Sequence, residues 1–153
     1  MAEAKLSELD WLLGEWQGYG IVGKQYNLIR KSYAYEVGGT FLVERTLSMF
    51  PPGKPDTEFE MHQDFMVLHQ NGDQLGAKGF YIEGFVSQSE VNIADGGKQI
   101  VIESTTIENG PPGTRTRYTL TRESDDAFKG QFEIAWPGQD FELSQKITMK
   151  RIG

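Results

Sequence analysis

The side chains able to do catalytic or metal chemistry are few in this chain and do not form a site. The sequence has no cysteine, which excludes disulfides, thiolate metal ligands and cysteine nucleophiles. Its two histidines, His62 and His69, share an alternating run with Asp64, but His69 has the opposite parity, so three ligands do not converge on one metal. No Gly-x-Ser-x-Gly turn accompanies the serines. These patterns predict neither catalysis nor a metal site.

A binding pocket is the other kind of site, and polar residues at apolar positions indicate one. In "FLVERTLSM", Arg45 alternates in step with Phe41 and with further apolar residues, and Gln63 and Gln145 hold the same kind of position in later runs. Buried polar groups of this kind must pair with each other, with trapped water or with a ligand. The residues predicted to line a ligand site are Tyr33, Tyr35, Phe41, Arg45, Met61, Gln63, Phe65, Phe132 and Gln145.

Alternating runs separated by turn residues supply the elements that position these side chains. A short helical turn, Ser7–Gly14, comes first, with Ser7 as its cap and Gly14 as its stop. Short connections make neighbouring strands antiparallel. The ten predicted strands are Glu15–Val22, Leu28–Val37, Thr40–Met49, Thr57–His69, Gln74–Ile82, Phe85–Ile93, Gln99–Ile107, Thr114–Arg122, Ala127–Ala135 and Asp140–Ile152.

A meander of this length closes on itself, because an open sheet would expose two edges. We therefore predict an all-β fold: a single ten-stranded antiparallel up-and-down β-barrel, closed at one end by the N-terminal helical turn. Side chains of one parity share a face, so we expect His62 outside with Glu60 and Asp64. A barrel of this size holds about one small molecule.

Composition narrows the possible partners. The 153 residues carry a formal net charge of −7, which argues against a nucleic-acid or anionic-membrane surface, since both need clustered Lys and Arg. No run approaches the ~20 apolar residues of a membrane helix, and "MAEAKLSELD" lacks the pattern of a signal peptide. We expect one cytoplasmic domain over residues 1–153, without membrane insertion, as a monomer or homodimer.

The first predicted strand carries a family signature. Gly14, Glu15 and Trp16 follow the short helical turn and resemble the Gly-x-Trp motif of the calycin superfamily, which includes lipocalins and fatty-acid-binding proteins. The resemblance implies that Trp16 closes the bottom of the barrel and that a basic residue of the last strand, here Arg151, lies across its ring. A guanidinium over an indole contributes roughly 0.5–2 kcal/mol. This pair is expected to be structural.

Within this superfamily the chain is most similar to the lidless nitrobindin group and to uncharacterised bacterial barrels. The connection "GIVGKQYN" is too short for the two-helix lid of fatty-acid-binding proteins, and "LLGEWQGYG", "GGTFLVERT", "EMHQDFMVL" and "LSQKITMKR" carry the likeness. Nitrobindins bind haem through a histidine of the last strand and act on nitric oxide or peroxynitrite. This chain has Ser144 and Gln145 there, and neither is a good ligand for ferric haem, so no cofactor is predicted.

Three functions stay open at this stage. We favour a binding protein that holds a small hydrophobic or amphipathic molecule, with Arg45, Gln63 and Gln145 toward its polar head. The second hypothesis is a structural or interaction domain whose core is filled by its own side chains and whose stiff loops "FPPGKPD" and "ENGPPG" contact a partner. The third is a nitrobindin-like haem protein.

Overall fold

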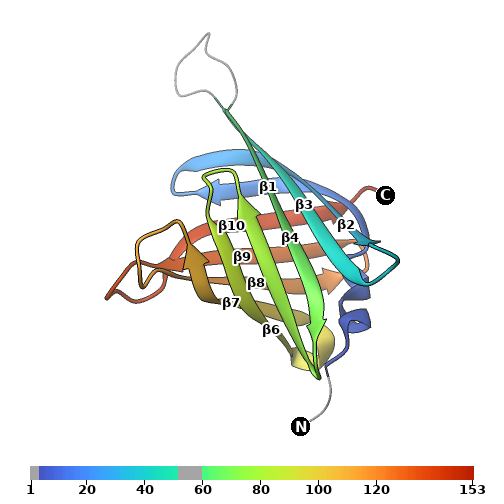
Figure 1. Cartoon of the computed structure of the whole chain (residues 1–153). Helices are drawn as coiled ribbons and strands as arrows, with labels where there is room; N and C mark the ends of the chain where they lie inside the picture. Colours follow the sequence, from blue (N-terminus) through green and yellow to red (C-terminus); the bar gives the residue numbers. More distant parts are fainter. Residues whose placement is uncertain (1–3, 52–59) are drawn as a thin grey trace.

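The computed structural model describes residues 4–51 and 60–153, and within them ten strands form one closed antiparallel barrel (Figure 1). Two short 3₁₀ helices accompany them, η1 (Leu6–Leu12) and η2 (Asp95–Gly97). The strands are β1 (Gly14–Val22), β2 (Gln25–Glu36), β3 (Phe41–Phe50), β4 (Glu60–Asn71), β5 (Gln74–Tyr81), β6 (Val86–Ala94), β7 (Gln99–Glu108), β8 (Arg115–Ser124), β9 (Ala127–Ala135) and β10 (Glu142–Arg151).

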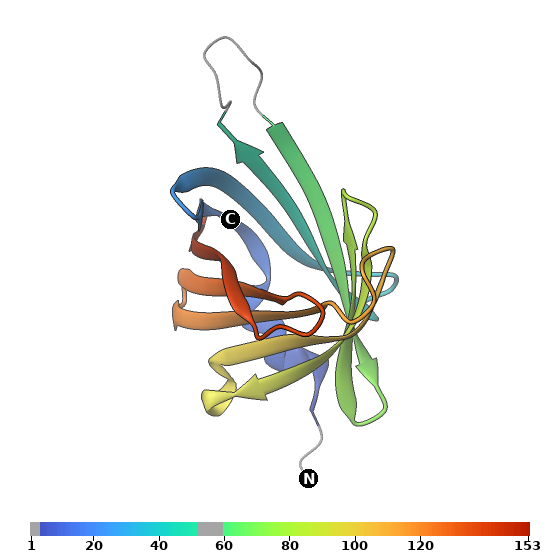
Figure 2. The ribbon, with the colours of Figure 1, turned by 90° about the vertical axis from the view of Figure 1, so that its left-hand side faces the viewer.

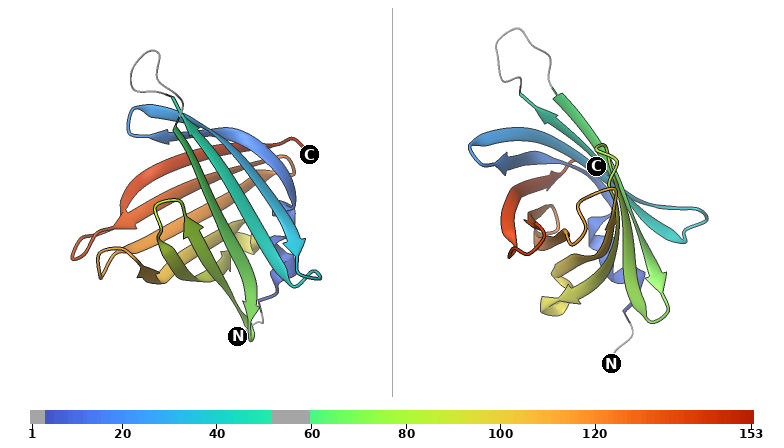
Figure 3. Two further views of the ribbon diagram at one scale, coloured as in Figure 1. Left: turned by 45° about the horizontal axis from the view of Figure 1, so that its top comes forward. Right: turned by 60° about the vertical axis from the view of Figure 1, so that its left-hand side comes forward.

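Each strand pairs with its neighbours in sequence, and β1 also pairs with β10, so the sheet has no free edge. At this seam Trp16 lies opposite Arg151. The strands of the two halves cross steeply: β3 and β4 run diagonally in front of β8, β9 and β10 (Figures 1 and 3). The predicted ten-stranded up-and-down barrel is confirmed.

Most element bounds lie within two residues of the predicted ones, and the start of β2 differs more. β2 begins at Gln25, three residues before the predicted start, because Gly23 (φ +61°) makes a tight turn with Lys24. The first three residues of the predicted strand Thr57–His69 lie outside the described residues, as does most of the "FPPGKPD" loop.

The helix η1 covers the end of the barrel where β1 begins and β10 ends (Figure 2). Its residues Leu9 and Leu12 are fully buried. The predicted Ser7 cap is wrong. The helix begins at Leu6 and its N-cap is Lys5, whose backbone N–H donates to the Glu8 carboxylate at 2.8 Å. In the described part of the chain no helix is long and apolar enough to cross a membrane.

The predicted inward faces of β3 and β4 are wrong. The turn Val37–Thr40 sets a register in which Tyr33 lies opposite Glu44, so odd-numbered residues of β2 share a face with even-numbered residues of β3. In β4 the even-numbered residues face inward as well, because Leu42 pairs with Leu68. Leu42, Glu44, Met66 and Leu68 are accordingly buried.

A register shift also separates β10 into two parts. It falls between Leu143 and Gln145, where β10 pairs with β9. Gln145, Ile147 and Met149 keep the predicted inward face, whereas Leu143, predicted inward, is exposed. The bulge adds one residue to the strand and so changes which side chains face the interior.

Candidate functional site

The interior of the barrel is divided into a filled half and a hollow half. At the η1 end, the fully buried side chains Trp16, Phe128 and Met149 pack against Leu9 and Leu12. The opposite end, where β1 turns into β2, holds a cavity of about 420 Å³. Ligand pockets in proteins usually span about 300–1,000 Å³, so this hollow is large enough for a small molecule.

Most of the cavity wall is apolar. Ile29, Met66, Phe132, Ile134 and Ile147 line it from β2, β4, β9 and β10. Four further aromatic side chains line it, and they are Phe50, Tyr81, Phe85 and Trp136. The site therefore offers an apolar enclosure with several aromatic rings in its wall.

A buried ion pair lies in the floor of the cavity. Lys31 Nζ lies 3.4 Å from Glu44 Oε1, and both side chains are less than a tenth exposed. Lys31 also donates to Thr46 Oγ1 at 2.8 Å, and the Tyr33 hydroxyl donates to Glu44. Removing two charges from water is unfavourable unless they are paired and hydrogen-bonded, and this cluster satisfies both conditions.

The Tyr118 hydroxyl is the exception in this floor. Tyr118 lines the cavity, and its buried oxygen has no hydrogen-bond partner among the described residues. Its ring lies beneath Lys31, with Nζ 5.5 Å from the ring centroid. A buried hydroxyl without a partner is unfavourable by about 1–3 kcal/mol, so this group is free to bond a molecule in the cavity.

Acidic side chains also line the cavity, among them Asp64 and Glu83. Asp64 accepts a hydrogen bond from the Ile82 backbone N–H at 3.2 Å, and burial raises the pKa of its carboxyl above the ordinary value. His62 contacts two carboxylates, Glu60 at 3.2 Å and Glu83 at 3.4 Å. The prediction that His62 and Asp64 lie outside the barrel is wrong, since both line the cavity.

Four tyrosines give the barrel a testable response to alkali. Burial, and for Tyr33 and Tyr118 the nearby Glu44 carboxylate, raises the pKa values of Tyr33, Tyr81 and Tyr118. Burial and the bond to Asp10 raise the pKa of Tyr35 to about 12. The folded state therefore keeps protons that unfolded tyrosines lose above about pH 10, so the free energy of unfolding falls as the pH rises through this range.

Tyr118→Phe tests this response. At neutral pH we expect the variant to be close to the wild type in stability, because the lost hydroxyl has no close hydrogen-bond partner among the described residues. Between about pH 10 and 11 its free energy of unfolding should fall less steeply than that of the wild type. The difference between the two slopes should be up to about 1.4 kcal/mol per pH unit. Denaturant unfolding at both pH values measures the difference, and identical slopes for the two proteins would contradict the assignment.

The predicted ligand-site residues separate into three groups. Phe132 and Gln145 line the cavity, and Tyr33 lies behind its floor at Glu44. Tyr35 faces inward at the η1 end, where its hydroxyl donates to Asp10. The other predicted residues lie on the outer face because of the β3–β4 parity, and they are Phe41, Arg45, Met61, Gln63 and Phe65. Of these, Phe65 also borders the cavity.

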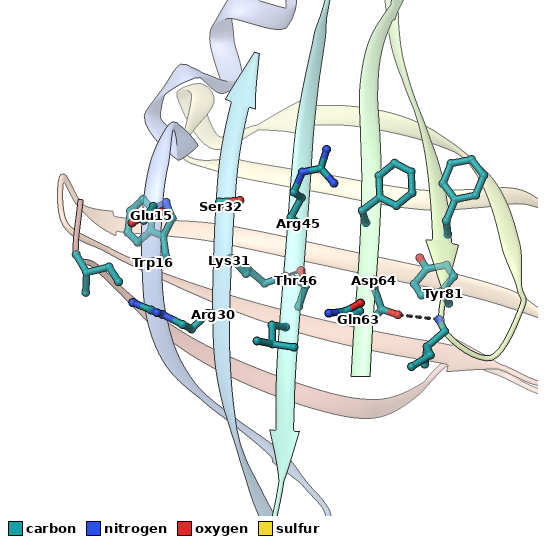
Figure 4. A pocket seen from close by; sticks show the side chains of 15 residues that line it. Glu15, Trp16, Arg30, Lys31, Ser32, Arg45, Thr46, Gln63, Asp64 and Tyr81 are labelled. Carbon is teal, nitrogen blue, oxygen red and sulfur yellow. Dashed lines mark hydrogen bonds between the residues drawn. The ribbon is translucent and has the colours of Figure 1, made fainter. Parts of the chain in front are cut away.

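Three of these outer residues belong to a shallow groove of about 570 Å³ on the outside of β1–β5 (Figure 4). Two neighbouring rows of paired residues line the groove. One row includes Ser32, Arg45 and Phe65, and the next row includes Arg30 and Gln63. Arg45 Nη2 donates to both carboxylate oxygens of Glu36, at 3.2 Å to Oε1 and 3.1 Å to Oε2. Its guanidinium is therefore not an anchor in the barrel interior.

The Trp16–Arg151 pair has the predicted geometry. Arg151 Cζ lies 4.2 Å from the Trp16 ring centroid. The sequence did not indicate that the same guanidinium also holds η1: it donates to the Leu13 carbonyl and, at 2.9 Å, to the Trp11 carbonyl. Arg151 thus joins the last strand, the first strand and the N-terminal helix at the closed end.

The donor set for haem does not match the nitrobindin pattern. β10 presents Ser144 and Gln145 to the cavity, and Gln145 donates to Asn27 at 3.1 Å. His62 is the histidine that lines the cavity, and both its ring nitrogens lie near carboxylates. These residues do not fit an axial haem ligand on the last strand.

Comparison with known proteins supports the fold. No family model and no curated protein matches the sequence. Fifteen chains of solved structures match, among them the crystal structure of Rv2717c from M. tuberculosis, with a TM-score of 0.72 over 97% of each chain and 16% sequence identity. At this identity the likeness shows a shared barrel and nothing about the ligand.

Proposed function

We propose that this protein is a small-molecule binding protein that holds an amphipathic ligand in the interior cavity. The observation that carries the proposal is a mostly apolar hollow of about 420 Å³ whose wall includes the buried Tyr118 hydroxyl, which has no close hydrogen-bond partner among the described residues. A convergent polar group in an apolar enclosure is the usual character of a ligand site. The cavity favours this function over a structural domain with a self-filled core, because side chains fill the half of the barrel next to η1 and leave a hollow in the opposite half.

Calorimetric titration with decanol, a neutral amphiphile, tests the proposal. We expect the wild-type protein to bind decanol at one site, with a negative heat-capacity change that reports apolar burial. Ser144→Trp places a large ring at the mouth, where Ser144 lines the cavity, and should weaken binding at least about tenfold, which is about 1.4 kcal/mol.

Gln88→Trp is the matched control. Gln88 is exposed on β6 and does not line the cavity, so this variant should bind decanol as the wild type does. If decanol does not bind, or if both tryptophan variants bind it like the wild type, the interior is not the binding site.

A further inference from the structure

The charges around the cavity are unequal in number. Three carboxylates line it: Glu44, Asp64 and Glu83. Asp64 lies opposite Thr46, in the same row across the sheet as Lys31, whereas the Glu83 side chain is about half exposed. Among the described residues that line it, Lys31 is the single Lys or Arg. Lys31 is already engaged by Glu44 and Thr46, so Asp64 and Glu83 give the cavity its net negative charge, with His62 beside Glu83.

This arrangement opposes an anionic ligand head. A carboxylate entering the cavity would approach Glu44, Asp64 and Glu83, which all line it. Like charges that share one cavity repel strongly where water is partly excluded. To pair with the ligand, Lys31 would have to leave Glu44, which would then be a buried, unpaired charge.

Two further features favour a cation. The unpartnered Tyr118 oxygen is buried and can accept a hydrogen bond from an ammonium group. The cavity is also lined by the rings of Phe50, Tyr81, Phe85 and Trp136. Aromatic faces attract ammonium groups, and rings combined with carboxylates are a common environment for alkylammonium ligands.

We infer that the ligand of this cavity is an alkylammonium compound, with its apolar chain against the barrel wall and its ammonium group among Asp64, Glu83 and these aromatic rings. This inference rests on the proposed function, because it specifies the ligand class of the same cavity. It separates the protein from barrels that hold fatty acids, whose carboxylate heads require an available cation.

Three probes with the same chain and different heads test the inference: decylammonium, decanol and decanoate. Calorimetric titration of the full chain, below the micelle-forming concentration of each probe, should show decylammonium binding about tenfold more tightly than decanol. Decanoate should bind more weakly than decanol. The double variant Asp64→Asn with Glu83→Gln should reduce the preference for decylammonium over decanol to about threefold or less, half the tenfold preference on the free-energy scale.

The matched control removes two exposed carboxylates elsewhere. Asp73→Asn with Glu90→Gln changes the net charge equally, and neither residue lines the cavity, so this variant should keep the wild-type preference. Decanoate binding as tightly as decylammonium, or an equal loss of preference in both double variants, would overturn the inference while leaving the proposed function intact. Failure of all three probes to bind would overturn both.

Discussion

Replacing Trp16 with alanine is expected to lower the free energy of unfolding by about 3–5 kcal/mol, the range of large-to-small aromatic changes in a core. The side chain is fully buried. Its Nε1–H donates to the Leu12 carbonyl at 2.7 Å, and its ring meets Phe128 edge-on with centroids 4.7 Å apart. Alanine would remove these contacts and the ring beneath Arg151 together, and would leave a cavity at the closed end.

Two further variants make this result specific. Trp16→Phe keeps an aromatic face for Arg151 and Phe128 but loses the bond to Leu12, so it should lose clearly less stability than alanine. Trp136→Ala, at the mouth, removes a ring that is 43% exposed and should have a much smaller effect. Denaturant unfolding measures all three. An unchanged midpoint for Trp16→Ala would show that the ring does not close the barrel.

The second large effect is expected at the buried ion pair. Glu44→Leu leaves the Lys31 ammonium with Thr46 alone and leaves the Tyr33 hydroxyl without its acceptor. Removing one partner of a buried pair usually lowers stability by about 3–5 kcal/mol, because the other charge stays buried and uncompensated. We expect a loss of this size in denaturant unfolding at neutral pH.

Removing the whole cluster should restore much of that stability. Replacing a buried pair by apolar residues of similar volume is often neutral or stabilising, so Lys31→Met and Tyr33→Phe added to Glu44→Leu should recover most of the loss. Recovery would indicate that the polar cluster contributes little to the free energy of unfolding and that its role is to shape the polar part of the cavity. If the triple variant were less stable than Glu44→Leu, the cluster would instead be a net contributor to stability.

The barrel could be predicted from the sequence because turn residues and alternation agree along almost the whole chain. Short connections leave antiparallel pairing as the simple topology, and closure follows from the need to cover edges. The Gly-x-Trp signature located the closed end, and the parity of β10 placed Arg151 beside it. These features depend on local residue types, which a sequence displays directly.

Which alternate residues of β3 and β4 face the interior could not be predicted in the same way. In β3 the alternate residues Phe41, Val43 and Leu47 form the more apolar set, yet the opposite set faces inward. The register of the Val37–Thr40 turn decides the matter, and it brings Glu44 and Thr46 to the inward Lys31. A polar cluster in the interior reverses the usual relation between hydrophobicity and burial.

One signal for the site was present in the sequence. Lys31 shares its parity with Tyr33 and Tyr35, both of which were expected to line the interior site. A lysine on an inward face requires a buried carboxylate nearby, and this requirement points to Glu44 on the next strand. Tyr118 gave no comparable signal, because its missing partner is apparent only when the surrounding side chains are placed.

The central claim is that the interior of the barrel is the binding site. Nuclear magnetic resonance tests it most directly, by following the chemical shifts of the labelled protein as decylammonium is added. The account predicts that the largest shifts occur at cavity residues such as Tyr118, Phe132 and Ile147. Shifts confined to the outer groove, at Arg45, Gln63 and Phe80, with the cavity residues unmoved, would contradict it.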